Sequence, residues 1–208
     1  MILIVKDSPD PFLPLDPLEA MMRGIFNRIP FMSGTVTNEG MLFIGQAKAL
    51  NATTEQMEAY WPSVGVRFIS DVAATEREWL INNITFNYYN HPAGETGLAR
   101  DQPLVDLLTD VMFMSPDQKM VEVMSRHHDR VYNYHLTQQT NNSLLGNFVG
   151  LDKEYSPIHL DDLTFLFDEM LGVDMTAKSP EDAALRNHSN VTNCLVQNST
   201  EKDHMSLT

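Results

Sequence analysis

The sequence is poor in cysteine, in basic residues and in long apolar runs. Its single cysteine, Cys194, excludes an intrachain disulfide. Lysine and arginine together number 14 against 28 aspartates and glutamates, which leaves a net charge of −14. This excess of negative charge argues against nucleic acid and anionic membrane surfaces as partners. No segment approaches the ~20 apolar residues of a transmembrane helix. We therefore expect no nucleic-acid partner and no membrane span.

The sequence does contain enough apolar material for a sizeable core. Hydrophobic residues make up 43% of the 208 positions, and a chain of this length suits one domain or two small ones. The acidic residues are interpreted as a solvated surface. Methionines such as Met120 and Met124, which share a helical face with Val123, are expected to fill the core rather than bind a ligand.

Triplets that accept asparagine-linked glycans are more frequent than chance predicts. The sequence contains six Asn-x-Ser/Thr triplets, against about two expected at this composition. The excess indicates a parent protein that passes through the secretory pathway to an extracellular location. The apolar start from Met1 to Val5 is too short for a signal peptide, so we expect none in this chain. The candidate acceptors are Asn51, Asn83, Asn141, Asn187, Asn190 and Asn198.

The residue pattern predicts two β-strands separated by several helices. Residues 29–37 and 130–136 are rich in strand-forming residues. A helix over 71–86 is expected to begin at Asp71 and to place Trp79 and Phe86 on its apolar face. Further helices are expected over 18–27, from Thr53 or Thr54 to 60, over 101–113 with Pro103 in the first turn, and over 115–128.

Two residues that can act as an acid and a base lie where predicted elements end. Glu39 follows the first strand, and Gly40 after it indicates a turn. His159 lies in a proline-containing loop about 20 residues after the second strand. A loop imidazole can contact a carboxylate that fixes its tautomer and stabilises its protonated form. Taken alone, each residue is more typical of an ordinary solvated turn or loop than of a catalytic site.

Metal binding is not expected. His127 and His128 are adjacent, but no third ligand stands at a suitable spacing from them. Histidines at the end of a helix can instead interact with its exposed carbonyl groups. Asp161 and Asp162 follow His159, and we expect Asp162 to cap the short turn over residues 163–167 rather than to act directly in catalysis.

Several motifs in a fixed order resemble the C-terminal half of the type B carboxylesterase and cholinesterase family, which includes the non-catalytic neuroligins. The similarity runs from Pro14 to about Leu171. The matching segments are residues 11–14, 29–34 running into 37–40, 109–113, 131–134, 159–163 and 165–167. The resemblance implies part of an α/β-hydrolase fold with few parallel strands and many crossover helices. It also implies that Glu39 is the acid and His159 the base of a Ser-Glu-His triad, with no cofactor or metal.

The resemblance has two gaps. No Gly-x-Ser-x-Gly, the turn that carries the family nucleophile, occurs in these 208 residues. Near the other end, residues 180–186 resemble the start of a late helix, but Val191-Thr192-Asn193-Cys194 replaces the family's Trp-Thr-Asn-Phe. We therefore expect a partial hydrolase domain over residues 1–178 and a divergent polar tail over 179–208.

The resulting expectation is the acid–base half of a carboxylic-ester hydrolase, inactive alone. A small-molecule ester would be the substrate of the intact parent. In that parent, the strands near 30–36 and 131–136 should lie side by side in a parallel sheet, which brings Glu39 and His159 together. Two alternatives stay open: a cholinesterase-like adhesion or scaffold protein, and a truncated gene product without a function of its own.

Overall fold

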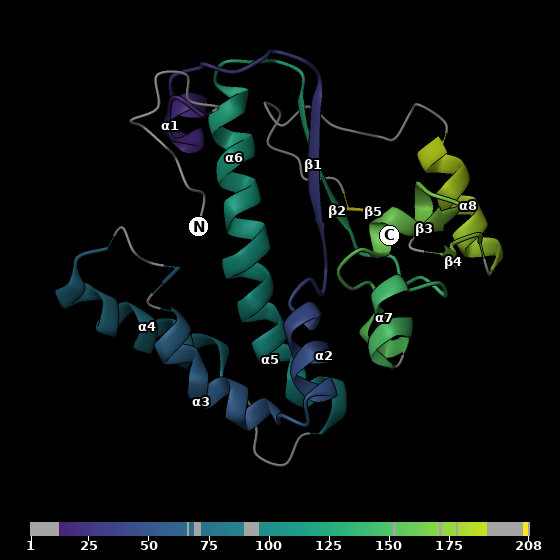
Figure 1. Cartoon of the computed structure of the whole chain (residues 1–208), viewed down its shortest axis with the longest axis horizontal. Coiled ribbons are helices and arrows are strands. Elements are labelled where there is room, and N and C mark those ends of the chain that lie inside the picture. Colours follow the sequence, from purple (N-terminus) through teal and green to yellow (C-terminus); the bar gives the residue numbers. More distant parts are fainter. Residues whose placement is uncertain are drawn as a thin grey trace.

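The structure is a computed structural model, shown in Figure 1. It describes residues 13–65, 67–68, 72–89, 96–151, 153–170, 172–177, 179–190 and 206–207. The α-helices are α1 (Pro17–Met22), α2 (Met41–Ala49), α3 (Thr54–Gly65), α4 (Ala74–Tyr88), α5 (Gly97–Thr109), α6 (Ser115–Ser125), α7 (Leu144–Val149) and α8 (Pro180–Asn190). The strands are β1 (Phe31–Val36), β2 (Val131–Leu136), β3 (Glu169–Met170), β4 (Val173–Asp174) and β5 (Ser206–Leu207). A π-helical turn covers Asp110–Met114, and 3₁₀ turns cover Lys153–Tyr155 and Asp161–Phe165.

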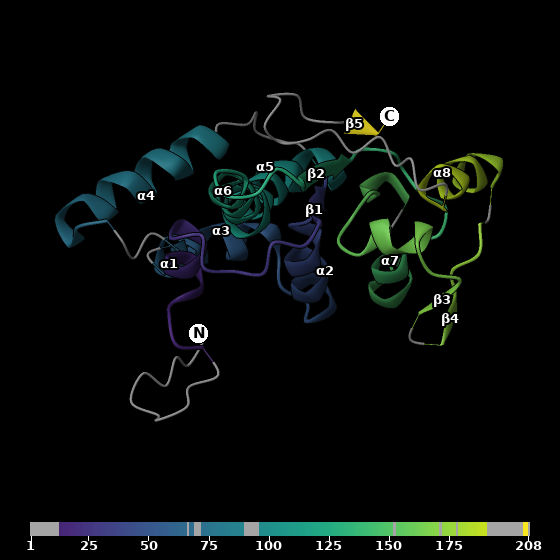
Figure 2. The same ribbon diagram turned by 90° about the horizontal axis from the view of Figure 1, so that it is seen from above.

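The central sheet is parallel, with the strand order β1-β2-β5. β1 and β2 are aligned from Phe31 opposite Val131 to Val36 opposite Leu136. They are connected through helices α2 to α6, which confirms the expected helical crossover between parallel strands. Among the described residues, no strand pairs with the outer edge of β1. Figures 1 and 2 show α6 on one side of this strand pair and α7 and α8 on the other.

One long helical segment replaces the two helices expected over 101–113 and 115–128. α5 continues through the π-helical turn directly into α6. The expectation that Pro103 lies in a first turn is wrong, because α5 begins at Gly97 and Pro103 is in its interior. Contacts upstream of the proline hold the added turn: Arg100 pairs with Glu58 at 2.6 Å, and Asp101 is buried.

Among the described residues, three apolar clusters form the core. The largest packs α2 and α5 around Met41, Ile44 and Leu104 and reaches Ile158 beside His159. A second contains Val36, Leu136 and Phe165, with Leu185 of α8 packed against it, and a third contains Val121, Met124 and Val131. Burial of Val123 and Met124 agrees with the expected helical face.

Helix α4 differs from its expected orientation. Trp79 and Phe86, expected on its apolar face, are exposed in the described structure, and Ile81 is its buried residue. Asp71, the expected cap, lies outside the described residues. In the part of the chain that the structure describes, no helix is both long enough and apolar enough to cross a bilayer.

Candidate active site

Glu39 lies at the carboxyl end of β1, in the turn that leads into α2. Only 6% of the residue is exposed. Its Oε1 accepts a hydrogen bond from the Val36 amide at 2.9 Å, so the carboxylate folds back onto the end of its own strand. Its other oxygen, Oε2, remains available for a partner outside the strand. The turn therefore presents one fixed carboxylate oxygen at the edge of the sheet.

That partner is His159. Nδ1 of the imidazole lies 2.6 Å from Glu39 Oε2, although 120 positions separate the two residues. The His159 side chain is 28% exposed, compared with 8% for the Glu39 side chain. A carboxylate at Nδ1 favours the tautomer that donates Nδ1–H and leaves a lone pair on Nε2. Among the described residues, no hydrogen-bond partner occupies Nε2. The imidazole can therefore accept a proton at Nε2 while Glu39 stabilises the resulting charge.

Main-chain contacts bring the histidine loop to the glutamate turn. The Asn38 amide donates to the Pro157 carbonyl at 3.0 Å, and Asn38 and Ile158 form a one-residue parallel bridge. The Asn38 side chain also donates to the Tyr155 carbonyl at 2.8 Å. Asn38, the residue before Glu39, is thus bonded to the loop that carries His159 through both its backbone and its side chain. These bonds fix the distance between Glu39 and His159.

Two side chains of helix α5 hydrogen-bond to the turn that carries Glu39. Gly40 N–H donates to Thr109 Oγ1 at 2.9 Å, and Gln102 Nε2 donates to Asn38 Oδ1 at 3.0 Å. Directly after Thr109, the π-helical turn places the ring of Phe113 against the His159 imidazole, with 5.2 Å between the ring centroids. Phe113 belongs to a motif noted in the sequence, but the contact depends on the π-helical turn, which helical periodicity does not predict.

Asp161 anchors the loop that carries His159. The residue is fully buried, and its Oδ2 accepts from the Ile158 amide at 2.9 Å and the Ser156 hydroxyl at 3.0 Å. Burial raises the pKa of the Asp161 carboxyl from about 3.8 to about 6, an effect that nearby hydrogen-bond donors partly oppose. Sequence reasoning did not assign this role. Its only signal was an acidic residue two positions after the histidine.

The expected capping role of Asp162 is wrong. The 3₁₀ turn Asp161–Phe165 has Leu160 at its N-terminal cap, without a side-chain cap hydrogen bond. Asp162 instead accepts a hydrogen bond from the hydroxyl group of Tyr134 on β2. Burial, followed by the charge of Asp162, raises the pKa of Tyr134. This tertiary contact with the neighbouring strand takes the carboxylate away from the turn.

Replacing Asp161 with asparagine should change how stability depends on pH. Because the folded-state pKa of Asp161 is raised, its contribution to stability is fully present below about pH 4 and is lost as the pH rises through about 6. A shift of about two pKa units corresponds to about 3 kcal/mol. Between pH 4 and pH 7, the wild-type protein should therefore lose about 3 kcal/mol relative to Asp161→Asn, measured by denaturant unfolding.

The matched control is Glu78→Gln, which neutralises an exposed carboxylate. Its difference from wild type should be nearly the same at both pH values. A pH-independent difference between wild type and Asp161→Asn would contradict the assigned titration of Asp161.

His127 and His128 lie at the other end of the sheet from His159. His127 Nε2 lies 2.9 Å from the Met22 carbonyl and His128 Nε2 lies 2.8 Å from the Ile29 carbonyl, so both bond to carbonyl groups outside their own helix. Within the described ranges, no group of three or more His, Cys, Asp or Glu residues is arranged to hold a metal ion.

The glycosylation candidates differ in accessibility. Asn51, Asn141 and Asn187 are exposed. Asn83 is half-buried within α4, and its side-chain amide donates to the Trp79 carbonyl at 2.9 Å. Asn190 is the last residue of α8, and Asn198 lies outside the described residues.

Comparison with known proteins identifies the family of the chain. Residues 3–196 match the Carboxylesterase family. The chain is also similar to a juvenile hormone esterase of Tribolium castaneum, with 27% identity over 177 residues. That alignment covers 77% of this chain and 29% of the relative, so the chain spans less than a third of the relative's length. The family match, the parallel strands and the helical crossover together show that the chain belongs to the carboxylesterase family and has part of its α/β-hydrolase fold.

Proposed function

We propose that this chain supplies the acid and the base of a serine carboxylesterase active site. The observation that carries the proposal is the 2.6 Å contact between His159 Nδ1 and Glu39 Oε2, which leaves Nε2 facing away from the carboxylate. Membership of the carboxylesterase family supports an ester as substrate. The serine nucleophile would come from sequence outside these 208 residues, which contain no Gly-x-Ser-x-Gly.

The proposed reaction needs no metal or cofactor. His159 Nε2 removes the proton of the serine hydroxyl as its oxygen attacks the ester carbonyl, and Glu39 stabilises the imidazolium that forms. Nε2 then donates this proton to the departing alkoxide oxygen, which leaves as an alcohol. In the second half, Nε2 activates a water molecule that hydrolyses the acyl-enzyme, and its proton returns to serine.

The substrate would be a small-molecule ester and the location extracellular. Six glycosylation triplets support passage of the parent protein through the secretory pathway. A juvenile hormone belongs in a substrate panel because one similar protein is named for its hydrolysis. Acyl-chain preference depends on pocket contacts worth about 1 to 3 kcal/mol per methylene, so the panel should include acetate, butyrate and longer esters.

Activity should require the nucleophile in addition to this chain. The purified 208-residue chain should not hydrolyse p-nitrophenyl acetate above a denatured control, and a fluorophosphonate probe should not label it. If sequence upstream of Met1 supplies Gly-x-Ser-x-Gly in frame, the chain extended with that sequence should do both. Stoichiometric labelling of a serine within residues 1–208 would contradict the proposal. Extended protein that is folded but neither labelled nor active would favour the scaffold alternative.

A further inference from the structure

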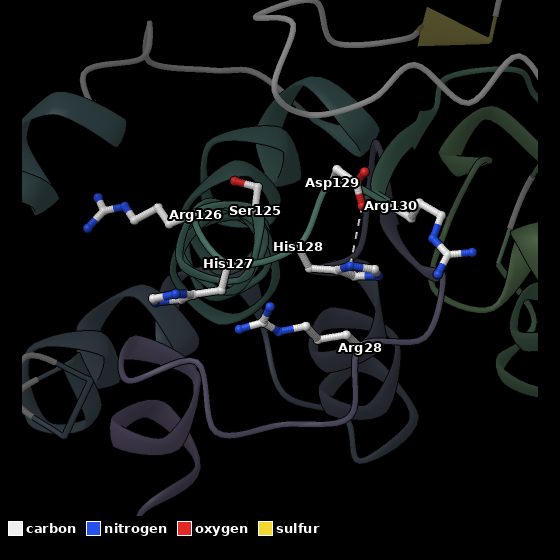
Figure 3. A pocket seen from close by; sticks show the side chains of 7 residues that line it. All are labelled: Arg28, Ser125, Arg126, His127, His128, Asp129 and Arg130. Atoms are coloured by element: carbon white, nitrogen blue, oxygen red, sulfur yellow. Dashed lines mark ion pairs between the residues drawn. The ribbon is translucent and has the colours of Figure 1, made fainter.

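A shallow basic hollow lies at the end of the sheet where β1 and β2 begin. It has a volume of about 510 Å³, and besides Ser125 its lining residues are Arg28, Arg126, Arg130, His127, His128 and Asp129. We call these six residues the basic hollow (Figure 3). Glu39 lies beyond the opposite end of β1, and a six-residue strand spans about 20 Å. The basic hollow is therefore separate from the candidate active site.

The fold gathers these cations from three segments. Arg28 precedes β1 and Arg130 precedes β2, and the parallel alignment of Phe31 with Val131 brings both approaches to one edge. The Phe31 amide donates to the Arg130 carbonyl at 2.9 Å, which fixes this edge. α6 ends at Ser125 and delivers Arg126 and both histidines to the same place. The cluster thus results from tertiary structure as well as from the run of residues after α6.

Hydrogen bonds fix the two histidine rings, whereas two of the arginines have no ion-pair partner among the described residues. His127 and His128 contact the Met22 and Ile29 carbonyls through Nε2. Arg126 pairs with Glu122. In the described part of the chain, neither Arg28 nor Arg130 forms an ion pair. In the view of Figure 3, the Arg28 guanidinium is drawn between the two imidazole rings, and the Arg126 and Arg130 side chains extend away from it toward opposite sides.

The carboxylate in the hollow does not balance these cations. Asp129 is 88% exposed at its side chain and lies 3.6 Å from His128 Nδ1. Three guanidinium groups therefore line one hollow of a chain whose net charge is −14. Favourable interaction with the carboxyl end of α6 accounts for Arg126. It does not account for Arg28 and Arg130, because they stand outside that helix.

We propose that the basic hollow binds a ligand that carries two or more phosphate or sulfate groups. Guanidinium groups hydrogen-bond such oxyanions through paired N–H donors, and these charge-assisted bonds are the strong ones. Because the guanidinium groups are spread across the hollow, a ligand with several separated charges matches them better than a single carboxylate. The two histidines line the same hollow, with each Nε2 held by a carbonyl group and Nδ1 of His128 3.6 Å from Asp129.

Binding of inorganic tripolyphosphate to the full chain tests the proposal by calorimetry at low salt. Wild type should bind with 1:1 stoichiometry, and the double variant Arg28→Gln/Arg130→Gln should bind at least about tenfold more weakly. The matched control Arg67→Gln/Lys119→Gln removes the same charge from exposed positions elsewhere and should change the affinity by less than about twofold. Sucrose octasulfate in a parallel titration distinguishes a preference for sulfate from one for phosphate.

A second measurement does not depend on the folding of any variant. Tripolyphosphate should shift the imidazole NMR signals of His127 and His128 in the wild-type chain and leave those of His159 in place. Absence of 1:1 binding of either probe, equal weakening in both double variants, or unchanged signals for His127 and His128 would each overturn the proposal.

Discussion

Replacing His159 with alanine should abolish nearly all hydrolysis by the extended, nucleophile-containing protein. We expect kcat to fall by a factor on the order of 10⁶, as it does when the triad base is removed from another serine hydrolase. In the proposed reaction, Nε2 removes the proton from serine while Nδ1 contacts Glu39. Initial rates with p-nitrophenyl acetate, normalised to active-site titration, measure the change.

Glu39 should contribute only through His159. We expect Glu39→Gln to lower kcat about 10⁴-fold, because the amide cannot stabilise the imidazolium and disturbs its tautomer. The double variant should be no slower than His159→Ala alone, since the two residues act as one unit. Activity of His159→Ala close to wild type would remove His159 from the role of base. Additive losses in the double variant would show that Glu39 acts on the reaction separately.

Replacing Gly40 with alanine should be among the most destabilising single substitutions in this chain. A Cβ at position 40 would lie 2.4 Å from the Val105 carbonyl oxygen and 2.9 Å from Leu108 Cβ. Val105 is fully buried in α5, so its backbone cannot move aside easily. We expect a loss of about 3 to 5 kcal/mol in the free energy of unfolding, together with displacement of the neighbouring Glu39. Denaturant unfolding measures the loss.

Gly150→Ala measures the cost of placing alanine in a left-handed backbone conformation without a steric clash, for comparison with the clash at Gly40. Gly150 has φ of +68° and open space around its Cα, so alanine there should cost only about 1 to 2 kcal/mol. Gly40 has φ of −60°, a conformation that alanine adopts freely. Its cost must therefore come from contact with α5. Equal losses for the two variants would show that α5 yields to the added methyl group.

The acid–base pair could be anticipated from the sequence because its location depends on topology. Strands at 29–37 and 130–136, joined by helices, predict a parallel pair, and resemblance to a known family assigned Glu39 and His159 to its edge. The structure confirms that the two side chains meet. Their catalytic role stays a prediction.

Other parts of the site depend on contacts that local patterns do not contain. Proline lacks a backbone N–H and therefore favours the first turn of a helix. The helix nevertheless extends upstream of Pro103, where Asp101 accepts a buried hydrogen bond from Thr54. Aspartate is a residue type that often caps helical turns, but Asp162 accepts a hydrogen bond from Tyr134 on β2 instead. The contact of Phe113 with His159 requires a π-helical turn between two regular helices.

The bridge between Asn38 and Ile158 makes the closeness of positions 39 and 159 independent of their side chains. It is made by main-chain atoms, so it does not depend on which side chains stand at positions 39 and 159. A family member could therefore carry other side chains at both positions and still keep the two positions as neighbours. Proximity at this edge is inherited with the fold, whereas hydrolysis has to be retained by selection on individual side chains.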